Sequence, residues 1–105
     1  MKWEITKLFA RKIYNNFSNV VESVSWKCSH EYQLNGKTCE ETRIGTSRIS
    51  LPDETSFIVF NKLTQDDVLQ WVFESGIDKN SIENDLIKSA DNKINQPVVA
   101  MDNPW

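Results

Sequence analysis

Two cysteines and the single histidine, Cys28, His30 and Cys39, are the side chains best suited to hold a metal ion. A structural zinc site normally uses four such ligands in closely spaced pairs. If the chain folds back at Asn35-Gly36, the two cysteines lie four residues apart along adjacent strands, roughly 13 Å at ~3.3 Å per residue. That separation is too large for a shared ion or a disulfide bond. We therefore expect no metal site and no cofactor.

A general-base pair is the second chemistry that the sequence suggests, because the same fold-back places His30 opposite Glu41. Such a cross-strand contact is more often structural. No nucleophile or second carboxylate converges on it, and the glycines, Gly36, Gly45 and Gly76, are too far apart for a phosphate-binding loop. The sequence therefore predicts a protein that is not an enzyme and has no catalytic residues.

Nucleic-acid binding would need a basic stripe on an exposed sheet face, with Trp3 or Phe9 available to stack on bases. The cations that could form it are Lys7, Arg11, Lys12, Lys27, Arg43 and Arg48. Their wide spacing and the net charge of −3 argue against this function.

The charge is unevenly divided along the chain. Eight basic and five acidic residues up to Ile49 give +3, whereas four basic and ten acidic residues from Ser50 onward give −6. Either the two halves attract each other within one domain, or the acidic half meets a basic partner. In the second case the protein could be a host-directed inhibitor that mimics nucleic acid.

Four tryptophans are many for 105 residues. Trp26 and Trp71 fit a core between sheet and helix. Trp105 follows Pro104 in a segment without periodicity, and a tryptophan there offers a large contact area with few rotatable bonds. We expect this segment either to close its own domain or to insert into a partner. The contact residues would be Val99, Met101, Pro104 and Trp105.

The element that would position the cysteines and the histidine is a β-hairpin between Val20 and Leu51. Its first arm alternates apolar and polar residues, and Asn35-Gly36 suits a two-residue type I′ turn. This turn sets the register. The expected pairs are Leu34 with Lys37, Tyr32 with Cys39, His30 with Glu41, Cys28 with Arg43, and Trp26 with Gly45.

Two further strands and two helices complete the prediction. A strand from Trp3 to Tyr14 slips in its pattern near Lys7-Leu8, and the apolar run 57–60 predicts a fourth strand. Thr64 and Asp67 form a capping box for a helix that ends near Gly76. A second amphipathic helix ends before Pro97.

The predicted fold is α+β, an antiparallel β-meander of about four strands with two C-terminal helices packed on one face. Residues 1–105 form a single domain, with a sheet part (1–60), a helical part (64–95) and an extended tail (96–105). No run approaches the ~20 apolar residues of a membrane span, and residues 1–7 lack a signal-peptide core. The expected core is Val24, Trp26, Ile5, Ile58, Phe60, Val68, Leu69, Trp71, Val72, Leu86 and Ile87.

Four stretches of the chain are similar to a known group of proteins: residues 1–5 (MKWEI), 20–28 (VVESVSWKC), 63–72 (LTQDDVLQWV) and 104–105 (PW). They resemble a family of small proteins of tailed bacteriophages, many of them phages of marine cyanobacteria and other marine bacteria. The resemblance implies a phage origin, hence the host cytoplasm or the virion, and no catalytic activity. We expect a structural or protein-interaction component that binds a protein partner or itself, with a nucleic-acid-binding accessory factor or a host-directed inhibitor as alternatives.

Overall fold

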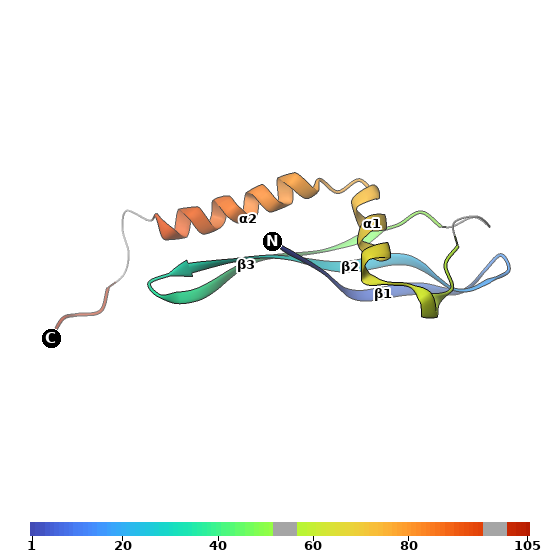
Figure 1. Cartoon of the computed structure of the whole chain (residues 1–105), viewed down its shortest axis with the longest axis horizontal. Helices are drawn as coiled ribbons and strands as arrows, with labels where there is room; N and C mark the ends of the chain where they lie inside the picture. The colour runs from blue at the N-terminus through green and yellow to red at the C-terminus, as the bar shows by residue number, and fades with distance from the viewer. Residues whose placement is uncertain (52–56, 96–100) are drawn as a thin grey trace.

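The computed structural model describes residues 1–51, 57–95 and 101–105. Three strands, β1 (Lys2–Tyr14), β2 (Phe17–Leu34) and β3 (Lys37–Arg48), form an antiparallel sheet in the order β1-β2-β3. A 3₁₀ helix η1 (Phe60–Lys62) precedes α1 (Gln65–Glu74) and α2 (Lys79–Ile94). Both α-helices lie on one face of the sheet, and α2 runs along its length (Figure 1). The molecule is elongated, 70 × 24 × 16 Å, and its α+β class is the predicted one.

The hairpin between β2 and β3 has the predicted register. All five expected pairs are present, from Leu34 with Lys37 to Trp26 with Gly45. Asn35 and Gly36 have φ values of 54° and 78°, the positive angles that a type I′ turn requires at both central residues. The central strand β2 pairs with β1 and β3 together only between Ser23 and Ser29. Each end of the described sheet is therefore a two-stranded arm.

Pairing between β1 and β2 contains two irregularities. The first lies between Ile5 and Lys7, close to the predicted slip, and the second lies between Phe9 and Ala10. The second was not predicted, and it breaks the alternation of β2. As a result Val20 and Val21 are both buried, although a regular strand would place them on opposite faces.

The predicted fourth strand at 57–60 is wrong. In the described residues this stretch is unpaired, and its end belongs to η1. Phe57 instead stacks on Phe17 of β2, with ring centroids 4.2 Å apart and planes 12° from parallel. An apolar run without alternation can cover the end of a sheet with its side chains and leave its backbone outside the ladder. Phe60 and Ile87, both expected in the core, are exposed.

Both helices begin at capped residues. In α1 the Thr64 hydroxyl accepts from the Asp67 backbone N–H and the Asp67 carboxylate accepts from the Thr64 N–H, each at 3.2 Å. This is the predicted capping box. Asp78 caps α2 by accepting from the Ser81 N–H at 3.0 Å. The short turn at Gly76, where φ is 107°, lets the chain change direction between the two helices.

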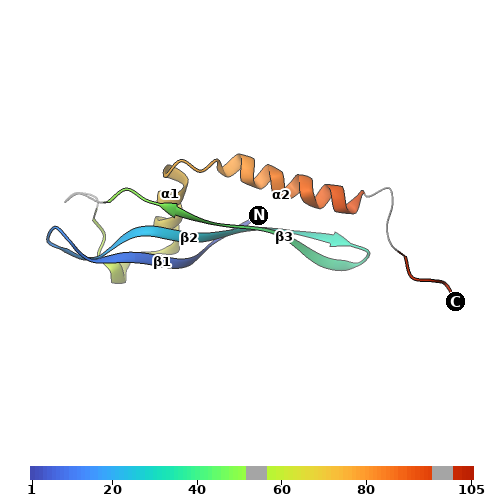
Figure 2. The same ribbon diagram turned by 180° about the vertical axis from the view of Figure 1, so that it is seen from behind.

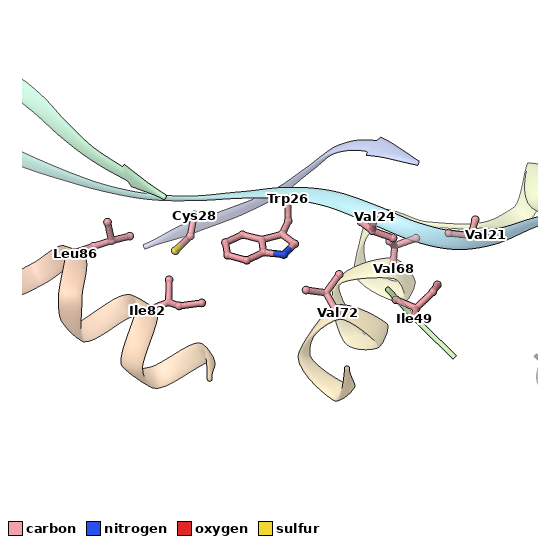
Figure 3. Close-up of a cluster of buried hydrophobic side chains, with 9 residues drawn as sticks. All are labelled: Val21, Val24, Trp26, Cys28, Ile49, Val68, Val72, Ile82 and Leu86. Carbon is pink, nitrogen blue, oxygen red and sulfur yellow. The ribbon is translucent and has the colours of Figure 1, made fainter. Parts of the chain in front are cut away.

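The core lies between the sheet and these helices, with Trp26 at its centre (Figure 3). Val68 and Val72 reach it from α1, and Ile82 and Leu86 reach it from α2. The Trp26 indole is 5% exposed and donates its N–H to the Ser47 hydroxyl at 2.9 Å, so its polar atom is satisfied inside the core. α1 packs on β1, and α2 packs on β2 and β3. None of the described helices is both long and apolar enough to cross a membrane.

Candidate functional site

The segment 101–105 is the most exposed apolar part of the described chain. Trp105 is 93% exposed and Met101 is 84% exposed, and Pro104 is also exposed. The segment lies at one end of the long molecule, beyond the last turn of α2 (Figure 2). Trp105 therefore does not pack on the described body of its own chain, which leaves insertion into a partner as the open expectation. Val99, the fourth predicted contact residue, lies outside the described residues.

An apolar cavity of about 190 Å³ lies toward the other end of the molecule. Its walls come from residues 19–21 of β2, residues 49–51 after β3, Phe57, Ile58, Leu63 and two residues of α1, Trp71 and Glu74. Sequence reasoning missed this cavity. The non-alternating run at 57–58 was the available signal, since apolar side chains that do not form a strand must cover another surface.

A cluster of polar side chains surrounds Glu41, the partner predicted for His30. The two residues are opposite each other in the ladder, as expected. The Glu41 carboxylate accepts a hydrogen bond from the Tyr32 hydroxyl at 3.1 Å and forms an ion pair with Lys93 of α2. The hydrogen bond from Lys93 lowers the pKa of Glu41. The same contact raises the pKa of Lys93.

This cluster suits structural attachment better than proton transfer. A carboxylate with a lowered pKa is a weaker base, and its oxygens already accept from two donors. Tyr32 has a raised pKa, caused first by burial and then by its hydrogen bond to Glu41, so its proton is held more firmly. The arrangement joins the last turn of α2 to the part of the hairpin where β2 pairs with β3 alone.

The two cysteines are separate, as the register predicted. Cys28 is fully buried beneath α2, whereas Cys39 lies four residues further along the hairpin opposite Tyr32. Burial, with a smaller contribution from the nearby charge of Glu83, raises the pKa of the Cys28 thiol to about 11. Among the described residues no group of three or more His, Cys, Asp or Glu side chains is placed to hold a metal ion.

The six cations considered for nucleic-acid binding do not form one stripe. Arg11 pairs with Glu22 at 2.8 Å, and Lys27 pairs with Glu40 at 3.9 Å. Arg43 is opposite the buried Cys28 and pairs with Asp85 of α2 at 3.7 Å, so it faces the helices. Carboxylates beside these cations reduce the positive potential available to phosphates.

Contacts between α2 and the sheet join the acidic half of the chain to the basic half. The Trp3 indole N–H donates to the Glu83 carboxylate at 2.8 Å, and Arg43 and Lys93 pair with carboxylates across the same interface. Exposed ion pairs contribute little individually, about 0–1 kcal/mol. Arg43–Asp85 joins a cation of the basic half to a carboxylate of the acidic half, as attraction within one domain requires, whereas Lys93–Glu41 has the opposite arrangement, so these pairs do not favour either interpretation of the charge division.

A family described as a domain of unknown function, DUF7936, matches residues 1–105. The chain belongs to this family. The DUF7936 match covers the sheet, both helices and the exposed segment 101–105, and its description names no activity, ligand or partner. Comparison with curated proteins and with solved structures gave no match.

Proposed function

We propose that this DUF7936 protein is a non-enzymatic protein-interaction component of a bacteriophage, either a minor part of the virion or a factor that acts during infection. The observation that carries the proposal is the exposure of Trp105, 93% of whose surface is open to solvent. The resemblance of residues 1–5, 20–28 and 63–72 to proteins of tailed phages supports the origin. The protein partner is bound by the segment 101–105, with Trp105 as the anchor.

The energetic argument rests on the area of the indole. Burying a tryptophan side chain removes about 150–250 Å² from water, worth on the order of 5 kcal/mol before the cost of ordering the segment. This free energy is not gained while the tryptophan stays in water, so an exposed tryptophan and an exposed methionine in the same short segment favour a contact surface. Aromatic anchors of this kind dominate many protein interfaces.

The test compares three versions of the full chain in infected host cells: wild type, Trp105→Ala and a matched control, Ile13→Ala. Ile13 is also apolar and 74% exposed, but it lies on the outer arm of β1. We expect the wild type and the control to capture the same protein in quantitative affinity purification, and Trp105→Ala to lose it. An identical protein set for all three versions would refute the proposal.

Mass spectrometry of purified virions separates the two roles within the proposal. A virion part remains with the particles through purification, and an infection-stage factor is found only in the lysate. The same measurement on particles that carry the Trp105→Ala chain asks whether the anchor is needed for incorporation.

A further inference from the structure

We infer that the apolar cavity of one molecule receives Trp105 of a second copy, so that the chain associates head to tail. This inference rests on the proposed function and identifies the partner as another copy of the same protein. The proposed occupant is the Trp105 side chain, which is 93% exposed, and the proposed site is the cavity of about 190 Å³ beside α1.

The cavity has the size and the chemistry that an indole requires. An apolar cavity of about 150 Å³ holds benzene, so one of about 190 Å³ has room for the larger two-ring side chain of tryptophan. Phe57, Leu63 and Trp71 supply apolar and aromatic walls. Offset or edge-to-face contacts of Trp105 with Phe57 or Trp71 would add to the burial of area.

An indole N–H that is buried in this cavity needs an acceptor, and Glu74, whose side chain ends in a carboxylate, is one of the residues that line the cavity. One Glu74 oxygen accepts from Gln70 at 2.9 Å, and a carboxylate can accept several more hydrogen bonds. The protein already uses this pairing elsewhere, since the Trp3 indole donates to Glu83 on α2 at 2.8 Å. The same donor and acceptor types would meet between copies.

The positions of indole and cavity favour a second copy as the occupant. The segment 101–105 lies beyond α2 at one end of a molecule 70 Å long (Figures 1 and 2). The cavity walls come from the start of β2, the residues that follow β3, and α1, toward the other end. The segment that carries Trp105 and the cavity are different surfaces at opposite ends of the molecule. Each molecule can therefore insert its own Trp105 into one neighbour and receive the Trp105 of another. Repeated head to tail, this heterologous contact extends into a chain or ring of copies, whereas two antiparallel molecules that exchanged it reciprocally would close a symmetric dimer.

The experiment measures self-association of the full chain by sedimentation velocity over a range of concentrations. The donor variant, which lacks the inserted side chain, is Trp105→Ala; the acceptor variants alter the cavity that receives it. One acceptor variant is Ile58→Trp, which fills the cavity, and the other is Glu74→Ala, which alters an exposed residue at the end of α1 and so spares the core. We expect the wild type to form species larger than a dimer, and each variant to associate at least about 10-fold more weakly.

Mixing the donor variant with an acceptor variant gives the decisive result. Trp105→Ala retains an intact cavity, and Ile58→Trp retains an intact Trp105, so the mixture can form one productive contact only. We expect a 1:1 complex that grows no further, at concentrations where each variant alone stays largely monomeric because it associates at least about 10-fold more weakly. Melting curves of the isolated variants verify that all are folded.

Three outcomes would overturn the inference. A wild type that is monomeric at every concentration excludes a second copy as the occupant. Loss of thermal stability in monomeric Trp105→Ala would show that the indole fills the cavity of its own chain. Equal association of the wild type and both kinds of variant would place the contact elsewhere. If the wild type is monomeric but captures another protein through Trp105, the proposed function stands and only this inference fails.

Discussion

Replacing Gly45 with alanine tests the packing at the centre of the core. Gly45 lies opposite Trp26 in the β2–β3 ladder, and a Cβ added there would lie 2.5 Å from Cζ2 and 2.9 Å from Cε2 of the indole. Carbon atoms in ordinary contact are about 3.5–4.0 Å apart, so the ring or the strand must move by roughly 1 Å. The indole has little freedom to do so, because it is buried and its N–H is bonded to Ser47.

We expect Gly45→Ala to destabilise the protein, although the effect of this substitution on the unfolded chain alone would stabilise it. Gly→Ala in a strand with ordinary backbone angles normally stabilises by about 0.4–1 kcal/mol, since the unfolded chain loses conformational entropy. Overpacking a core costs about 1–3 kcal/mol. We therefore expect Gly45→Ala to lower the free energy of unfolding by about 1–2 kcal/mol, which for a domain of this size lowers Tm by roughly 4–15 °C.

Urea unfolding and thermal melts of four proteins would measure this effect: wild type, Gly45→Ala, Trp26→Phe and the double variant. In Trp26→Phe a single phenyl ring replaces the two-ring indole, so the ring that contacts the new methyl group is absent. Gly45→Ala should therefore lower the free energy of unfolding much less in that background. The difference between the two backgrounds is the coupling energy of the pair. A Gly45→Ala protein as stable as the wild type, or equal effects in both backgrounds, would refute the packing argument.

Three further predictions concern the thiols, the Glu41 cluster and the first helix. Alkylation of the native protein at about pH 8 should modify Cys39 and spare Cys28, whose pKa is raised to about 11 by burial, and peptide mass mapping would detect equal labelling if this is wrong. Lys93 lowers the folded-state pKa of Glu41, so the stabilisation by this pair is present above the unfolded pKa of about 4.3 and is lost as the pH falls through the lowered value. The urea stabilities of wild type and Lys93→Met should therefore differ at neutral pH and converge in acid, and a constant difference would contradict this assignment. Thr64→Ala should cost about 1 kcal/mol in urea unfolding while Thr64→Ser costs little, and equal losses would show that the capping hydroxyl is unimportant.

The hairpin between β2 and β3 was predictable in detail because short-range chemistry determines it. Asn35 and Gly36 accept positive φ, a two-residue loop allows one register, and the period of two selects the buried face. The register in turn separates Cys28 from Cys39. The capping box of α1 was predictable for the same reason, since its donor and acceptor residues are three positions apart.

The errors came from contacts between residues far apart in the chain. Phe57 resembles a strand residue by composition, but it stacks on Phe17, forty positions earlier. The irregularity at Phe9 and Ala10 depends on which residues of β2 lie opposite, and no local pattern reveals it. The exposure of Ile87 depends on how α2 is rotated against the sheet.

The sequence by itself determined the α+β class, the hairpin, its register, the presence of two helices and the start of the first, because these follow from backbone conformation and from residues at most a few positions apart. Only the tertiary structure decided that the sheet has three strands in its described part, that the run at 57–58 lines a cavity, and that Trp105 stays in solvent. Burial is the physical reason for this division. Burial depends on which surfaces pack together, and these come from residues far apart in the chain. The free energy of removing their apolar area from water depends on side chains that no short window of sequence contains.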